Sequence, residues 1–103
     1  MKKITAALLA GTAALAFTAS VQAEPDGEAI YNQACMACHM TGAAGAPIKG
    51  DADAWAPRLE QDMETLYAHA IEGIGAMPPK GGHMNLSDDE VKAAVDFMLE
   101  PVL

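Results

Sequence analysis

The apolar residues that follow position 23 recur at intervals of three and four, and no stretch alternates between apolar and polar residues as a half-buried strand does. The clearest stripe lies near the C-terminus and consists of Val91, Ala94, Val95 and Met98, with Phe97 alongside. Ser87 and the three acidic residues after it form a capping box that starts this helix, and Pro101 ends it. The pattern therefore predicts a capped C-terminal helix with one buried face.

Three earlier segments also have helical spacing. Helices are expected over residues 26–35 and 63–72, each with an aspartate as N-cap. Residues 53–59 are expected to form a short helix that Pro57 makes irregular. The inner faces of the two longer helices are Gly27, Ile30, Tyr31 and Ala34 in the first, and Leu66, Tyr67, Ala70 and Ile71 in the second.

Two stretches, residues 40–50 and 73–82, are rich in glycine and proline and are expected to be loops. The prediction is thus an all-α fold of three to five helices with long loops. Such loops have a reason if they wrap a cofactor. A domain this small buries a thin core, so a bound cofactor would also act as a staple.

The stretch Cys35-Met36-Ala37-Cys38-His39 indicates which cofactor this is. Two cysteines separated by two residues and followed by a histidine form the attachment pattern of haem c. Each thiol can form a thioether with one porphyrin vinyl group, and the next residue then lies beneath the iron, where an imidazole can ligate it. The chain has no other cysteine. We therefore expect one covalent haem c held by Cys35 and Cys38, with His39 as an iron ligand.

Three other uses of the cysteine pair fit less well. A thioredoxin-like redox pair needs a βαβ context, which the helical pattern does not offer. A zinc site needs a second ligand pair, and His69 and His83 lack the spacing of one. A disulfide across two residues would be small and strained, and would leave His39 without a role. His69, between two alanines on a helix, is expected at the surface or with its hydrogen bonds satisfied.

The N-terminal segment differs from the rest of the chain. Lys2 and Lys3 are followed by an uncharged apolar run and by Val21-Gln22-Ala23, a pattern typical of a secretory signal peptide. The apolar run is short for a membrane anchor. We therefore expect a signal peptide over residues 1–23, cleaved after Ala23, and one mature domain over residues 24–103 without a membrane span.

The charge distribution limits the partners. The whole chain has a net charge of −8, and beyond the signal segment four basic residues face fourteen acidic ones, so nucleic acid and anionic lipid are not expected as partners. Residues 29–50 and 73–87 contain no acid, and their only charges are Lys49 and Lys80. Since both segments must border the haem, we expect an apolar, nearly neutral contact surface there; a chance gap in an alanine- and glycine-rich chain is the alternative. Its expected residues are Met36, Ala37, Met40, Ala43, Ala44, Ala46, Pro78 and Pro79.

A helix with C-x-x-C-H, a later Met-Pro-Pro loop and a capped C-terminal helix with an aromatic residue resemble the class I c-type cytochromes. The segments similar to the small bacterial cytochrome c5 subgroup are Gly45-Ala46-Pro47, Gly50-Asp51, Trp55-Ala56-Pro57-Arg58 and Ala76-Met77-Pro78-Pro79-Lys80-Gly81. The resemblance covers essentially all of residues 24–103. It implies the cytochrome c fold and haem attachment outside the cytoplasm, in the bacterial periplasm.

The resemblance also implies roles for single residues. Met77 would be the second axial ligand, and the Pro47 carbonyl would accept the second ring N–H of His39. Trp55 and Arg58 would bond or pair with a haem propionate. The contact between the crossing first and last helices would be made by Gly27, Tyr31 and Phe97. Several cytochromes of the subgroup carry a second cysteine pair after the Met-Pro-Pro loop, where this chain has Gly82-His83-Met84-Asn85-Leu86 and hence no disulfide clamp.

Met84 and His83 are the rivals of Met77 as iron ligand, because the glycines before them give them reach. Met77 is favoured, since Pro78 and Pro79 stiffen the backbone after it and a ligand on a stiff chain loses less entropy on binding. An open iron site is the remaining alternative. A methionine thioether favours reduced iron, so the reduction potential should be positive.

With both axial positions filled by the protein, the iron has no free site for a substrate, and no convincing set of catalytic residues is present. We therefore expect an electron carrier and not an enzyme. The expected oligomeric state is a monomer, with a weak dimer as the alternative. The expected partners are redox proteins, namely a membrane cytochrome complex, an oxidase or a reductase. A haem enzyme or gas sensor in which Met77 leaves the iron is the competing function, and a redox subunit that works only within a complex is a third.

Overall fold

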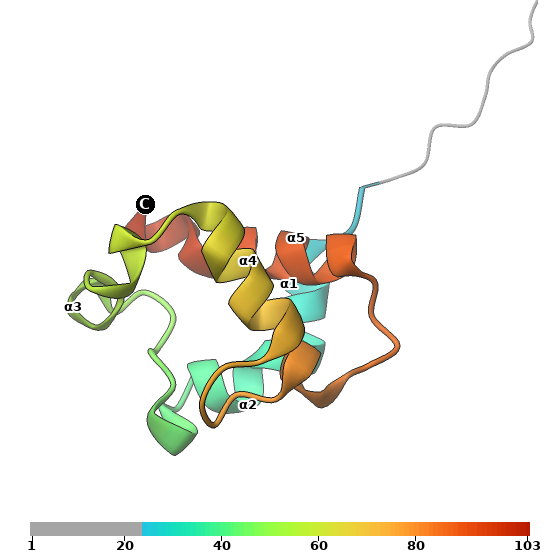
Figure 1. Ribbon diagram of the computed structural model, residues 1–103, viewed down its shortest axis with the longest axis horizontal. Helices are drawn as coiled ribbons and strands as arrows, with labels where there is room; N and C mark the ends of the chain where they lie inside the picture. The colour runs from blue at the N-terminus through green and yellow to red at the C-terminus, as the bar shows by residue number, and fades with distance from the viewer. Residues whose placement is uncertain (1–23) are drawn as a thin grey trace, which may run out of the picture.

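The computed structural model describes residues 24–103 (Figure 1). The expected signal peptide, residues 1–23, lies outside the described residues. The α-helices are α1 (Gly27–Ile30), α2 (Met36–His39), α3 (Ala52–Trp55), α4 (Met63–Glu72) and α5 (Asp88–Leu99). The described residues also contain one π-helical turn, η1 (Tyr31–Cys35). Four 3₁₀ turns are present as well: η2 (Ala43–Gly45), η3 (Arg58–Glu60), η4 (Pro79–Gly82) and η5 (Glu100–Val102).

The all-α prediction is confirmed for this part of the chain. Residues 24–103 contain no strand, and their only extended pairing is an isolated antiparallel bridge between Ile74 and Met77. No helix within the same residues is long and apolar enough to cross a membrane.

The elements α1, η1 and α2 form one continuous helical run. Asp26 caps its start through its side chain, as predicted. The sequence pattern placed the end of this helix at Cys35, but the run continues through His39. The reason lies in η1, where the Met36 N–H bonds back to the Tyr31 carbonyl across one widened turn, after which α-helical geometry resumes. The whole C-x-x-C-H motif is therefore helical.

Helix α1 crosses α5 at close range, and the two lie side by side in Figure 1. A Cβ atom on Gly27 would overlap the Ala93 carbonyl oxygen and lie 3.2 Å from Cβ of Phe97. Only glycine therefore lets the two backbones approach this closely. One turn along, the rings of Tyr31 and Phe97 have centroids 5.5 Å apart and are tilted by 55°. The expected crossing contact is present.

Helices α4 and α5 occupy the residues that the sequence pattern indicated. The Asp62 side chain accepts a hydrogen bond from the Thr65 N–H at 2.8 Å and so caps α4. The predicted capping box starts α5, with Glu90 N–H donating to Ser87 Oγ at 3.1 Å and Ser87 N–H to Glu90 Oε1 at 2.8 Å. These local bonds satisfy backbone groups that a helix N-terminus leaves free.

The core lies between the first helical run, α4 and α5. Its buried residues are Ile30, Tyr31, Trp55, Leu66, Ala70, Leu86, Val91, Ala94, Val95, Met98 and Leu99. Most belong to the predicted inner faces, whereas Trp55, Leu86 and Leu99 do not. Leu99, which is 0% exposed, comes one position after the predicted stripe. Leu86 belongs to the loop before α5 and fastens that loop to the core.

Candidate haem site

A cavity of about 470 Å³ opens beside this core. Its walls come from the first helical run, the loop at 43–47, α3, η3, α4, the loop at 74–83 and the C-terminal half of α5. All seven residues predicted to contact the cofactor line it, namely Cys35, Cys38, His39, Pro47, Trp55, Arg58 and Met77. The volume is in the usual range for cofactor pockets. The fold thus brings together residues from four separate segments at one site.

The two cysteines lie within the same helical run, one in η1 and one in α2, and both are partly buried free thiols. Burial raises the pKa of the Cys35 thiol to about 11. A redox-active dithiol needs the opposite shift, since the thiolate is the reactive form. Cys35 and Cys38 open onto one cavity, as two bonds to a single porphyrin require.

The imidazole of His39 is held on two sides. It is 7% exposed, and its Nδ1 lies 2.8 Å from the Pro47 carbonyl oxygen. Because a carbonyl oxygen can only accept, Nδ1 carries the hydrogen of this bond, and Nε2 is the ring nitrogen left to bind a metal. The ring is also stacked on Trp55, with centroids 6.1 Å apart and an interplanar angle of 20°. The tautomer and orientation are therefore those of a metal-ligating histidine.

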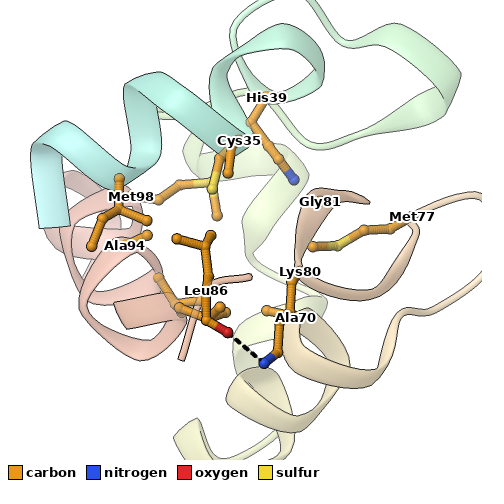
Figure 2. A pocket seen from close by; sticks show the side chains of 13 residues that line it. Cys35, His39, Ala70, Met77, Lys80, Gly81, Leu86, Ala94 and Met98 are labelled. Atoms are coloured by element: carbon orange, nitrogen blue, oxygen red, sulfur yellow. Dashed lines mark hydrogen bonds between the residues drawn. The ribbon is translucent and has the colours of Figure 1, made fainter. Parts of the chain in front are cut away.

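Met77 belongs to the loop between α4 and η4. The Ile74 N–H donates to the Met77 carbonyl at 3.0 Å and the Met77 N–H to the Ile74 carbonyl at 2.9 Å, so both its backbone groups are bonded. Gly73 follows α4 at φ +88°, and a Cβ atom there would lie 2.9 Å from the Met77 carbonyl oxygen. Figure 2 shows a smaller pocket that shares Cys35, His39 and Met77 with this cavity, and there the Met77 side chain extends toward the side on which His39 lies. The bridge adds rigidity that the prolines alone do not supply.

The two residues expected to bond or pair with a propionate, Trp55 and Arg58, differ from each other in the structure. The Trp55 indole N–H, its only donor, bonds to the Ile48 carbonyl at 3.0 Å, so the structure gives it a backbone partner in place of the expected propionate. Its ring instead packs beside His39. Arg58 is exposed and donates from one guanidinium nitrogen to the Ala54 carbonyl at 2.8 Å. Its other donors leave it available to a propionate.

Of the two rivals of Met77 as iron ligand, Met84 lies outside the cavity lining and His83 belongs to it. Met84 is 65% exposed and is not among the residues that line the cavity. His83 does line it, and so does His69, which the helical pattern placed at the surface or with its hydrogen bonds satisfied. Gln33 and Gln61 are further polar lining residues that the sequence did not indicate. Their isolated polar positions carry no local pattern that would have found them.

The expected apolar rim is largely present. Ala37, Ala43, Ala44, Ala46 and Pro78 line the cavity, and Met40 is 57% exposed. Met36, in contrast, is partly buried and packs against the core. The structure adds Ile74, which lines the cavity and is 51% exposed.

Comparisons with known proteins identify the family of the chain. The family model "Cytochrome C oxidase, cbb3-type, subunit III" matches residues 22–98. A cytochrome c-555 of Chlorobaculum tepidum is 43% identical over 100 residues, 93% of this chain and 88% of that protein. Cytochrome c5 of Azotobacter vinelandii is 42% identical over 74 residues, 70% of this chain and 89% of that protein.

Solved structures agree as well. A cytochrome c in the "Crystal structure of electron transfer complex of nitrite reductase with cytochrome c" is 43% identical, with a TM-score of 0.71, over 80% of this chain and 100% of that one. A mono-haem ferrocytochrome c of Shewanella putrefaciens is 42% identical, with a TM-score of 0.63, over 78% of this chain and 95% of that one.

This protein belongs to the class I monohaem c-type cytochromes, and its cofactor is one covalently attached haem c with its iron. The residues present fit that group. The cavity offers two thiols, an imidazole with a free Nε2 and a thioether, all within mainly apolar walls.

Proposed function

We propose that this protein carries single electrons between redox proteins of the bacterial periplasm. The observation that supports this most is that His39 and Met77, from segments far apart in sequence, line the same cavity. With both as axial ligands, no coordination position remains for a substrate. When bound, the haem supplies an iron that alternates between the ferric and ferrous states.

The residues of the chain would each contribute one element of this function. Cys35 and Cys38 would hold the porphyrin by thioethers, and His39 would be the proximal ligand. The Pro47 carbonyl, 2.8 Å from Nδ1 of His39, fixes the imidazole and raises its basicity. The backbone bonds of Met77 hold the second ligand in place. Since neither ligand has to move, little reorganisation accompanies electron transfer.

The apolar rim around the cavity mouth would be the docking surface. Its alanines, Pro78 and the exposed Ile74 carry no charge, and electron-transfer complexes are often small and transient. The likeness to a cytochrome c solved in complex with a nitrite reductase supports a reductase as partner. Transfer to that partner should therefore depend weakly on ionic strength, although the net charge is high. A steep salt dependence would instead mean that the distant carboxylates steer docking.

The test of the ligand assignment compares two methionine variants. Met77→Ala should lose the far-red sulfur–iron absorption band of the oxidised protein, whereas Met84→Ala should keep it, because Met84 is exposed and lies outside the cavity lining. The reverse result would refute the assignment of Met77 as the axial ligand. Reduced wild-type protein should not bind carbon monoxide at neutral pH. Ready binding would favour the haem enzyme or gas sensor.

The signal peptide and the periplasmic location form part of the same proposal. They rest on the pattern of residues 1–23. Expression in a bacterium that matures cytochromes c should give a periplasmic, monomeric protein that begins at Glu24 and carries the mass of one haem. Intact-mass spectrometry of the periplasmic fraction and gel filtration check this, and a haem-loaded protein that retains Lys2 would contradict cleavage.

A further inference from the structure

The turn η4, which directly follows Met77-Pro78, has an uncommon backbone. Lys80 has φ +56° and Gly81 has φ +62°, both in the left-handed region. The left-handed region is energetically unfavourable for lysine, as for other residues that have a Cβ atom. Something outside the turn must hold Lys80 in place.

The contacts of the Lys80 ammonium account for this conformation. Its Nζ donates to the Leu86 carbonyl at 2.6 Å, drawn as the dashed line in Figure 2, and lies 3.3 Å from Oδ1 of Asp88. The Lys80 side chain is 15% exposed, whereas that of Asp88 is 64% exposed. The sheltered bond to the carbonyl therefore contributes more than the solvent-screened ion pair. Leu86 itself is fixed, since it is 6% exposed in the core.

The other side of the same turn is pressed against the helix that carries the haem motif. A Cβ atom on Gly81 would overlap the Ala34 carbonyl oxygen and lie 3.3 Å from the Ala34 carbonyl carbon. Ala34 directly precedes Cys35. The turn is thus held between the first helical run on one side and, through Lys80, the start of α5 on the other. Met77 cannot swing away from the cavity without straining one of these contacts.

We propose that Lys80 is a positioning residue for Met77. It closes the methionine loop onto Leu86 and Asp88. This inference rests on the proposed role of Met77 as axial ligand. Lys80 lines a small pocket beside Met77 but is not among the residues that line the 470 Å³ cavity, and its role is to limit how far the loop can open.

Competition with imidazole tests this directly. Imidazole binds ferric iron only where the methionine has left it, so its apparent affinity measures opening of the loop. Lys80→Met, which keeps the apolar stem and removes the ammonium, should bind imidazole about tenfold more tightly, equivalent to about 1.4 kcal/mol. Lys80→Arg should restore most of the wild-type affinity. Lys92→Met removes the same charge from α5, where its ammonium lies over the Tyr67 ring, and should leave imidazole affinity unchanged.

All titrations are followed by loss of the far-red band, under conditions where circular dichroism shows each variant folded. An unchanged imidazole affinity in folded Lys80→Met overturns the proposal, and so does an equal gain in Lys92→Met. Should Lys80→Met fail to fold, Lys80→Gln is titrated in its place, and an unchanged affinity there overturns it equally. Absence of the far-red band from the wild type would instead refute Met77 as ligand, so the two failures are distinct.

Discussion

The crossing of α1 and α5 makes Gly27→Ala a sharp test of the fold. A new Cβ atom would overlap the Ala93 carbonyl oxygen and lie 2.8 Å from the carbonyl carbon, and backbone atoms cannot rotate away as a side chain does. Overpacking of this kind costs about 1–3 kcal/mol, and the upper end applies here. The better helix propensity of alanine offsets roughly 0.5–1 kcal/mol of this loss in unfolding free energy. The net loss in unfolding free energy is therefore about 2 kcal/mol.

For a domain of this size, a loss of that magnitude lowers the melting temperature by about 8–16 °C. Guanidinium unfolding of the haem-bound protein, followed by circular dichroism, measures the free energy itself. Ala29→Gly, at an exposed position in the same helix, serves as control because it isolates the propensity term, a loss of about 1 kcal/mol. If Gly27→Ala were as stable as wild type or more stable, the helices would not approach as closely as the structure has them.

Three further predictions concern the core, a surface hydrogen bond and the cofactor. Leu99→Ala, at a 0% exposed position, should lose about 2–5 kcal/mol of unfolding free energy in denaturant titrations; a loss below 1 kcal/mol would contradict its burial. The hydrogen bond to Asp96, followed by partial burial, raises the pKa of Tyr67 to about 12, so its stabilisation is present below pH 10 and lost as the pH rises toward 12. Tyr67→Phe should accordingly lose less stability than wild type over that interval, and equal slopes would refute the linkage. The double variant Cys35→Ala, Cys38→Ala, which cannot hold the haem covalently, should be largely unfolded by circular dichroism, whereas cooperative native-like melting would count against the cofactor as the staple of the core.

The parts of the fold predicted correctly from the sequence are those controlled by local chemistry. Helices α4 and α5 have strong caps at Asp62 and Ser87 and clear apolar stripes, so neighbouring residues decide where they begin and which face is buried. The end of the first helix was misplaced because the π turn over Tyr31–Cys35 has no signature in the residue pattern. Leu86 was missed for a similar reason, since a loop residue has no periodicity that indicates burial.

In the candidate site, too, the residues predicted correctly are those whose roles depend on local spacing in the sequence. The C-x-x-C-H motif is recognisable because its chemistry depends on spacing within one helical run, and the cavity does collect its three residues. The partner of Trp55 was not predicted from the sequence, because its indole N–H bonds to the Ile48 carbonyl, seven residues earlier in the chain. Contacts such as that of Lys80 with Leu86 depend on how loops close, which composition and spacing do not determine.

Visible spectra of the purified protein, oxidised and reduced, test the central claim most directly. We predict a covalently bound, low-spin c-type haem whose oxidised form shows the far-red sulfur–iron band, with Cys35 and Cys38 both protected from alkylation. A colourless protein in which both thiols react with the alkylating reagent would contradict it.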